Sequence, residues 1–406
     1  MPTNPRTYVD VHILHTVPPA NLNRDDQGNP KEAYFGGVRR SRVSSQAWKR
    51  ATRLHFTDRM PLQHLATRTR RVSGDLIQRI VVATGVGQED AARLAAALLA
   101  PLNITAGKRQ GDTAYLFFYG HRQLDSVVDL VRDRTAELLA LGAKELAAEV
   151  TAMGIQEKFA AAHPLDVALF GRMVADIPAL RVDAATQVAH ALSTHAVDLE
   201  FDYFTAVDDR AQEEQETGAG MIGNIGFNSA TLYRYATVGL HQLRHNLSVP
   251  SAPPTSGKAA TPNGGRDGER AATGAAITGV QDFLTSFSRS IPSGYRNSFA
   301  HRTLPSLVAV VVREDQPVNL VSAFEEPVDS RSGIVAKSAE RLAAEYLTST
   351  RRWGDTPAFT AVCHSFDPTS RAAKQLTEAF GESRDFPDLL AGLGDHLTSA
   401  AARGPE

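Results

Sequence analysis

Residues 8–14 read YVDVHIL, a short stretch that carries the signature of a β-strand. Val9, Val11 and Ile13 alternate with Asp10 and His12, the period-two pattern of a strand with one buried face. We therefore expect the chain to begin with a half-buried strand, followed by a polar loop, NLNRDDQGNPKEA.

Further strand and helix patterns follow this first strand. The predicted elements of the core are, in chain order, a strand (8–14), a helix (44–56), two strands (200–207 and 228–238), a helix (272–289) and a strand (304–312). This order is that of the ferredoxin-like arrangement found in RNA-recognition domains. The two middle strands are separated by an excursion over 208–227, and a helix (336–352), a strand (358–363) and a polar tail complete the prediction.

An Ala/Leu-rich block interrupts this core and predicts a helical insertion over 59–189. Its clearest helical segments are QEDAARLAAALLA, SVVDLVRDRTAELLALGAKELAAEV and TQVAHALSTH, and YLFFY (115–119) could be a lone strand among them. The class is therefore α+β, with a sheet-based domain over 1–58 and 190–406. Residues 250–275 are rich in Pro, Gly, Ser and Thr, which predicts a mobile loop.

The composition restricts the function classes. Among 406 residues there are 43 Lys and Arg against 45 Asp and Glu, a formal net charge of -2, so any nucleic-acid binding must depend on where the charges lie. Cys363 is the single cysteine, which excludes an intramolecular disulfide and a cysteine zinc cluster. The N-terminal residues lack an apolar signal core and no run is long enough to span a bilayer, so we expect a cytoplasmic protein without a membrane partner.

Positive charge is concentrated early in the chain. Between Arg39 and Arg71 the only acid is Asp58. The basic residues of this span are Arg39, Arg40, Arg42, Lys49, Arg50, Arg53, Arg59, Arg68, Arg70 and Arg71. This concentration marks the span as a candidate surface for phosphates.

The helix predicted at 44–56 gives part of this charge a direction. Lys49, Arg50 and Arg53 fall within an arc of roughly 100° on one side of the helix. The opposite side carries Ala47, Trp48, Ala51 and Leu54. Ser44 or Ser45 is the expected N-cap and, with Gln46, adds neutral donors at the positive end of the helix, where anions bind readily. A solvated basic face remains the alternative interpretation of such a helix.

Three long blocks carry a resemblance to a known family. They are NLNRDDQGNPKEAYFGGVRRSRVSSQAWKRATR (21–53), GRMVADIPALRVDAATQVAHALSTHAVDLEFDYFTAVDD (171–209) and GFNSATLYRYA (226–236). Together they resemble the CasC family, the backbone subunits of type I-E CRISPR Cascade complexes. Beyond Ala300 the resemblance is only general.

The resemblance implies a hand-like, non-catalytic subunit that needs no cofactor or metal. It would have a modified RNA-recognition palm, a helical finger region and a protruding thumb over 196–227. Several copies would polymerise along one CRISPR RNA, hold its phosphates and present the spacer for pairing with a target DNA strand in antiviral defence. Other Cascade subunits and a recruited helicase-nuclease would be further partners.

The resemblance also assigns site residues. Lys31, Ser44, Gln46, Lys49 and Arg53 would contact phosphates and sugars of the RNA. Met173, in GRM, and Ile222, in GMIG, would wedge at a displaced base, although the glycine-rich GAGMIGNIG departs from the family and could shift the wedge by one residue. The full candidate set for RNA binding is Arg24, Lys31, Arg42, Ser44, Gln46, Lys49, Arg50, Arg53, Met173, Met221 and Ile222.

Two enzymatic alternatives compete with this interpretation. The pairs Asp25–Asp26 and Asp208–Asp209 could hold Mg²⁺ as in the metal-dependent ribonuclease subunits of type III complexes, although such pairs in polar loops are usually solvated or cap a helix. His241 and His245 have the spacing of a zinc-ligand pair but lack the glutamate of a zincin motif.

The aromatic residues near the two middle strands do not form the signature by which ordinary RNA-recognition domains stack bases. They are Phe201, Tyr203, Phe204, Tyr233 and Tyr235. We expect them to pack in the core or on a strand face.

Overall fold

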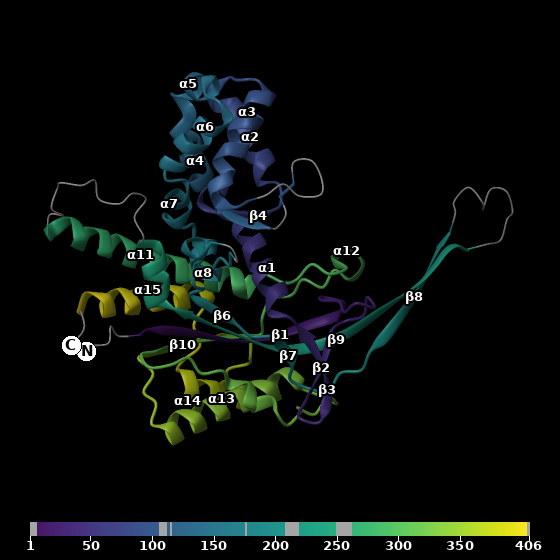
Figure 1. Cartoon of the computed structure of the whole chain (residues 1–406). Coiled ribbons are helices and arrows are strands. Elements are labelled where there is room, and N and C mark those ends of the chain that lie inside the picture. Colours follow the sequence, from purple (N-terminus) through teal and green to yellow (C-terminus); the bar gives the residue numbers. More distant parts are fainter. Residues whose placement is uncertain are drawn as a thin grey trace. The chain divides into compact units, whose positions relative to one another are not determined.

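The computed structural model describes residues 6–104, 112–113, 116–174, 177–207, 219–248 and 262–403, without the side chains of 205–207, 219–222 and 262–267. The chain divides into two compact units. Unit 1 comprises 1–55, 187–238 and 280–406, and unit 2 comprises 56–186 and 239–279. Helices and antiparallel strands are both abundant, which confirms the predicted α+β class (Figure 1).

Unit 1 is built on one large sheet with the strand order β11-β10-β1-β9-β7-β3-β2, and β6 and β8 pair with β9 beside this path. The strands are β1 (Tyr8–Ala20), β2 (Glu32–Phe35), β3 (Val38–Val43), β6 (Thr186–Val188), β7 (Ala191–Ser193), β8 (Glu200–Val207), β9 (Ala219–Gly239), β10 (Leu307–Arg313) and β11 (Phe359–His364). Strand β1 lies in the centre, between β10 and β9.

Helices cover both faces of this sheet. Helices α13 (Ile334–Trp353) and α14 (Arg371–Phe380) share one hydrophobic core with Tyr233 and Tyr235 of β9. Arg234, which points to the opposite face, contacts α1 (Ser45–Thr57) and α11 (Pro262–Arg289), and α15 (Phe386–Arg403) packs on the C-terminal part of α11. Two short helices, η4 (Leu320–Phe324) and α12 (Arg296–Phe299), complete the unit.

Because both faces are covered, the prediction of a half-buried first strand is wrong. Asp10 and His12 are fully buried, like the apolar residues between them. Each has hydrogen-bond partners that make burial possible. The hydroxyl of Tyr235 donates to Asp10 at 2.9 Å, and the hydroxyl of Tyr233 lies 2.9 Å from Nδ1 of His12.

Three other segments also differ from their predictions. The predicted helix TQVAHALSTH forms strands β6 and β7, because sheet pairing with β9 and β3 outweighs its weak helical pattern. The predicted loop over 250–275 is helical from Pro262 onward, where proline suits the first helical turn and Ala272, Ala276 and Val280 are buried at helical spacing. The predicted polar tail contains α14 and α15.

Unit 2 is the mainly helical part of the chain. Its helices are η1 (Leu62–His64), α2 (Val72–Thr84), α3 (Gln88–Leu99), η2 (Ala100–Leu102), α4 (His121–Arg132), α5 (Thr135–Ala140), α6 (Ala143–Ala152), α7 (Ile155–Ala160), α8 (Leu165–Phe170), η3 (Pro178–Leu180) and α10 (Leu240–Ser248). Strands β4 (Ala66–Thr69) and β5 (Phe117–Gly120) pair antiparallel as a separate two-stranded sheet, which confirms the strand expected near 115–119. Leu, Val and Ile side chains from most of these helices form a continuous core.

Strands β8 and β9 form a long hairpin that projects from the sheet of unit 1 (Figure 1). The glycine-rich residues 219–227 were predicted as part of an excursion, but they extend β9 and pair with β8. The ring of Phe204 lies directly over Gly223, where a Cβ atom would come within 2.2 Å of it. An aromatic ring over a cross-strand glycine covers the strand where it lacks a side chain, which explains how glycine is tolerated there.

None of the described helices is both long and apolar enough to cross a lipid bilayer.

A buried ion pair ties the central strand to its neighbour. Nε of Arg313 lies 3.1 Å from Oδ2 of Asp10, and the Arg313 guanidinium also pairs with Asp355. Burial raises the pKa of Asp10, while hydrogen bonds and the charge of Arg313 oppose that rise. We predict that Arg313→Met lowers the free energy of unfolding by about 3–5 kcal/mol at pH 7, because it leaves a buried carboxylate without its cation.

The loss should depend on pH. A carboxyl whose pKa is raised in the folded state binds its proton more tightly there, so the destabilisation of Arg313→Met should shrink as pH falls through the raised pKa of Asp10. Urea unfolding at pH 7 and pH 4 measures this difference. The double variant Asp10→Asn/Arg313→Met should regain much of the stability at pH 7, and a double variant no more stable than Arg313→Met would contradict the account.

Candidate nucleic-acid interface

The site predicted from the sequence begins where β3 runs into α1. Oγ of Ser44 accepts a hydrogen bond from the backbone N–H of Ala47 at 3.3 Å, so Ser44 is the N-cap. The backbone N–H of Ser44 in turn donates to Oδ1 of Asn23 at 2.9 Å. Ser44 is buried and Gln46 is exposed. The start of the helix is therefore fixed by the loop that precedes β2.

Helix α1 presents part of its basic face to solvent. Arg50 is exposed, whereas Lys49 and Arg53 are half-buried, and burial lowers the pKa of Lys49. Trp48 and Ala51 are buried, as expected. Leu54 was expected on the buried side but is 46% exposed, because it lies one turn after Arg50 on the solvent side.

The loop over 21–31 is ordered by its own polar side chains. Oδ1 of Asp25 accepts hydrogen bonds from the backbone N–H groups of Gln27 and Asn29, at 2.9 and 2.8 Å. Nδ2 of Asn21 donates to the carbonyl oxygens of Gly28 and Gly226, both at 2.9 Å, which attaches the loop to the base of the β8–β9 hairpin. The carboxylate of Asp25 therefore holds a turn together.

Strands β2 and β3 form a hairpin that the sequence analysis did not predict. Its turn residues, Gly36 and Gly37, both have positive φ, 60° and 76°. Two such residues in succession suit the tight turns that join antiparallel strands. The Gly-Gly pair between strand-like residues could therefore have predicted this hairpin from the sequence. The hairpin places Lys31 just before β2 and Arg42 near the end of β3.

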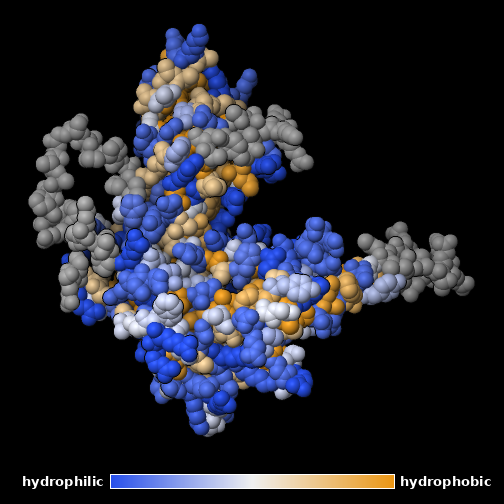
Figure 2. All heavy atoms as spheres, turned by 60° about the horizontal axis from the view of Figure 1, so that its bottom comes forward, coloured by the Kyte–Doolittle hydropathy of each residue, from blue (hydrophilic) through white to orange (hydrophobic). Residues whose placement is uncertain are grey.

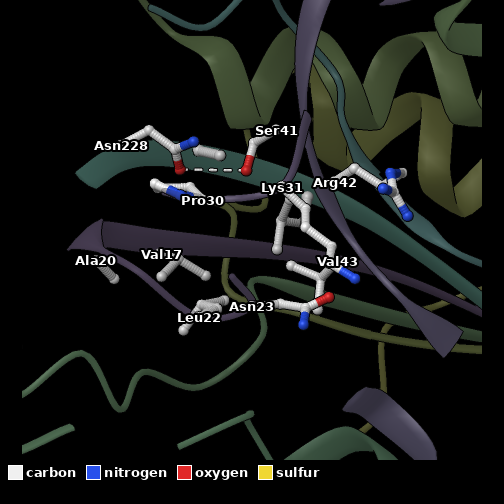
Figure 3. A pocket seen from close by; sticks show the side chains of 12 residues that line it. Val17, Ala20, Leu22, Asn23, Pro30, Lys31, Ser41, Arg42, Val43 and Asn228 are labelled. Atoms are coloured by element: carbon white, nitrogen blue, oxygen red, sulfur yellow. Dashed lines mark hydrogen bonds between the residues drawn. The ribbon is translucent and has the colours of Figure 1, made fainter. Parts of the chain in front are cut away.

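A small cleft lies beside these residues, between β1, β3 and β9 (Figure 3). Its lining includes Lys31, Arg42, Ser41, Asn23 and Asn228. Its volume of about 10 Å³ is close to that of one water molecule, and far below that of a pocket for a small organic ligand. The cleft can therefore take a single oxygen atom of a larger molecule that lies across the surface.

The polar groups around the cleft favour a negatively charged oxygen. Oδ1 of Asn228 accepts from Oγ of Ser41 at 3.1 Å, while the buried Nδ2 of Asn228 has no partner among the described residues. Arg42 lies 3.0 Å from Nδ1 of His190, whose pKa is lowered by burial and by the charges of Arg42 and Lys31. A neutral His190 can accept a hydrogen bond from the guanidinium of Arg42. Asn23 and Asn228 were not predicted as site residues, although both lie in the blocks that carry the resemblance.

Arg234 holds α1 against the sheet from within the core. Its guanidinium is buried between the rings of Trp48 and Phe287, 3.8 and 4.5 Å from their centroids. It lies 2.9 Å from Nδ1 of His15 and donates to the carbonyl oxygen of Phe287. Burial lowers the pKa of Arg234 to about 9. Burial also lowers the pKa of His15, and together with the positive charge of Arg234 brings it to about 3. His15 therefore accepts from Arg234 as a neutral ring.

The other six basic residues of the 39–71 span neither line the cleft nor lie on α1. Arg40 is fully buried and donates to the carbonyl oxygens of Ser193 and Phe324, at 3.0 and 2.8 Å, so its role is structural. Arg39 is exposed and pairs with Glu32 at 2.6 Å. The other four, Arg59, Arg68, Arg70 and Arg71, belong to unit 2.

The aromatic residues of the two hairpin strands divide into two groups. Tyr233 and Tyr235 are buried in the core, as predicted. Phe204 packs on a strand face, over Gly223, also as predicted. Phe201 and Tyr203 were expected to pack as well, but they are 57% and 65% exposed, because a two-stranded hairpin that projects from the sheet has no layer to cover it. Figure 2 shows hydrophobic residues on the surface of this hairpin.

The predicted wedge residues lie in different units. Met173, in unit 2, is 94% exposed. Its neighbour Arg172 is buried and exchanges two backbone hydrogen bonds with Val182, both 2.9 Å, which holds the backbone next to Met173 in place. Met221 and Ile222 lie on β9 opposite Ala206 and Thr205, and their side chains are outside the described residues.

The acidic and histidine residues do not assemble into a metal site in the described part of the chain, where no group of three or more potential ligands was found. Asp26 is exposed, and the carboxylate of Asp25 accepts the two backbone hydrogen bonds that hold its turn. Asp208 and Asp209 lie outside the described residues. His241 and His245 both lie on α10.

Comparison with solved structures reveals similar chains over almost the whole length. One, described as "CRISPR RNA-guided surveillance complex, pre-nicking", is 30% identical with a TM-score of 0.77, over 96% of this chain and 100% of that chain. Another, described as "CRISPR RNA-guided surveillance complex", is 25% identical with a TM-score of 0.68, over 96% of this chain and 99% of that chain.

None of the curated proteins matches this chain. The sequence model of the CT1975-like protein family, in contrast, matches residues 9–391. Together with the structural similarity over the full length, this match identifies the chain as a member of the CT1975-like protein family.

Proposed function

We propose that this chain is the non-catalytic backbone subunit of a type I-E CRISPR Cascade complex. The observation that carries the proposal is the cleft beside the capped start of α1, which is lined by the cations Lys31 and Arg42 and by the neutral amide of Asn228. It occurs in a chain that is similar over its full length to chains of CRISPR RNA-guided surveillance complexes. In this role the cleft and the helix hold the phosphates of a CRISPR RNA.

The architecture fits a hand with palm, fingers and thumb. The neighbours β10, β1, β9 and β8, with α1 and α11 on one face, follow the order of a ferredoxin-like RNA-recognition domain, and unit 1 would thus be the palm. Unit 2 would be the helical fingers inserted into it. The projecting β8–β9 hairpin would be the thumb.

The side chains at the cleft suit a guide-binding role. A guide must be held whatever its sequence, so the protein should contact phosphates and leave the base edges free for pairing. Lys31, Arg42 and Arg50 provide charge, and Asn228 Nδ2 provides a free donor within the described residues. None of these groups requires a particular base.

Polymerisation along the RNA would use the hairpin and the fingers. The 94% exposed Met173 and the residue Ile222 near the end of the hairpin would lie on either side of one displaced base per subunit. Inserting an apolar side chain between bases costs stacking energy, which the phosphate contacts would offset. The exposed aromatic residues of β8 would become covered when the hairpin meets the next copy.

The proposed role also implies partners and a compartment. The complex would act in the cytoplasm, where the held spacer pairs with a target DNA strand. Other Cascade subunits would join the assembled backbone, and a recruited helicase-nuclease would cut the target.

The alternative, a metal-dependent ribonuclease, receives less support. Its best candidate, Asp25, accepts two backbone hydrogen bonds that hold a turn, which leaves fewer lone pairs for a metal. Asp26 alone is a single exposed carboxylate.

We predict that Lys31→Ala/Lys49→Ala weakens binding to single-stranded RNAs of unrelated sequence to a similar degree. For two lost phosphate contacts, the slope of log K against log salt should flatten by about 1.4. Fluorescence anisotropy over a salt series measures both effects. The matched control is Lys337→Ala/Lys374→Ala, which removes two lysines from α13 and α14 on the other face of the sheet. Equal effects of the two double variants would contradict the proposed surface.

We predict that Asp25→Asn/Asp26→Asn leaves RNA affinity and RNA integrity unchanged. The amide oxygen of an asparagine at position 25 can still accept the two turn hydrogen bonds, but the pair loses the charge that a metal needs. The measurement is gel analysis of labelled RNA after incubation with Mg²⁺ and either protein. Cleavage by the wild type that disappears in the variant would support the ribonuclease instead.

A further inference from the structure

The loop between α11 and β10 is anchored at both ends, to the 21–31 loop and to β1. At one end, Gly294 lies so close to the 21–31 loop that a Cβ atom would come within 2.2 Å of the carbonyl oxygen of Asn21. At the other end, the hydroxyl of Thr303 donates to the carbonyl oxygen of Thr16 at 2.8 Å and lies 2.9 Å from Nε2 of His15. The Gly294–Thr303 loop therefore has a fixed place.

The loop contains the short helix α12, and the two residues that flank this helix have unfavourable backbone conformations. Tyr295 and Ala300 have φ values of 47° and 45°, and they are two of the four non-glycine residues with positive φ in the described part of the chain. Backbone conformations of this kind persist where the surrounding contacts impose them, and they cluster at binding sites. The anchors at Gly294 and Thr303 are such contacts.

The loop carries positive charge that has no internal partner. Arg296 and Arg302 are exposed, and neither side chain pairs with an acid among the described residues. Asn297 and Ser298 between them are exposed as well. A surface of two arginines with neutral donors between them suits phosphate and sugar oxygens.

The loop also positions a residue of the predicted site. The guanidinium of Arg24 lies over the ring of Tyr295, 5.0 Å from its centroid. Tyr295 packs edge-on against Phe299, with ring centroids 6.5 Å apart. Phe299 in turn packs against Phe227, at the base of the β8–β9 hairpin, with ring centroids 5.8 Å apart. This chain of rings gives Arg24, a residue on a loop, a defined direction.

From these contacts we propose that the Gly294–Thr303 loop is a second RNA-binding element, in which Arg296 and Arg302 contact phosphates of the single-stranded guide and Tyr295 positions Arg24. The inference rests on the proposed function and extends it to a segment outside the blocks of sequence that resemble CasC proteins. It assigns the backbone of the RNA two contact regions in one subunit, the cleft by α1 and this loop.

The first test replaces the two arginines. Arg296→Ala/Arg302→Ala should lower affinity for single-stranded RNA about tenfold at 0.15 M salt and flatten the log–log salt slope by about 1.4, the effect of two lost phosphate contacts. The matched control is Arg351→Ala/Arg352→Ala, two exposed arginines at the end of α13. Circular dichroism and thermal melting establish that each variant is folded.

The second test separates positioning from packing. Tyr295→Ala should weaken RNA binding, whereas Tyr295→Phe, which keeps the ring under Arg24, should bind like the wild type. In an Arg24→Ala background, Tyr295→Ala should have no further effect on affinity, because the residue it positions is gone. Additive losses of affinity would show that Tyr295 does not act through Arg24.

The outcomes distinguish this inference from the proposed function. A wild-type chain that binds no single-stranded RNA would overturn both. If the wild type binds RNA and the Arg296→Ala/Arg302→Ala variant has the same affinity and salt slope, only the proposal for the Gly294–Thr303 loop is overturned. Equal losses in that variant and in Arg351→Ala/Arg352→Ala would attribute the effect to overall charge and also reject the loop.

Discussion

The arrangement of the candidate surface depends on one buried cation, Arg234. Its guanidinium lies between Trp48 of α1 and Phe287 of α11, and it bonds to His15 of the central strand. A buried charge is costly unless its environment compensates it, and here aromatic faces, an imidazole nitrogen and a carbonyl oxygen do so. His15 must present a lone pair to Arg234, so its other nitrogen donates to Thr303. One cation thus fixes α1 and one end of the Gly294–Thr303 loop.

Around this centre, neutral polar side chains place the charged ones. Asn23 holds the start of α1, Asn21 holds the 21–31 loop to β9, and Asp25 closes the turn within that loop. The cations that remain exposed or half-buried, such as Lys31 and Arg50, are therefore presented on ordered backbone. Preorganised charge of this kind suits a subunit that must hold many guides in the same way, since phosphates are the feature all guides share.

The sequence predicted the class of fold, α1 with its cap, and the strands that carry regular patterns. It could not predict that Asp10 and His12 are buried, because their partners, Tyr235 and Tyr233, are more than 200 residues away. Strands β6 and β7 were missed since their pairing with distant strands overrides local propensity. Helix α15 was not predicted, although Leu389, Leu393 and Leu397 repeat every four residues, a pattern that indicates a helix.

In the proposed role, copies of this chain assemble along a guide RNA. Native mass spectrometry of the chain mixed with single-stranded RNAs of increasing length would detect this assembly. A backbone subunit should add one copy for each fixed increment of RNA length, because each copy occupies a constant number of phosphates. A variant without residues 208–218, which follow β8 in the sequence, should lose this regular increase. One copy per RNA at every length, or shortened RNA in the spectra, would contradict the account.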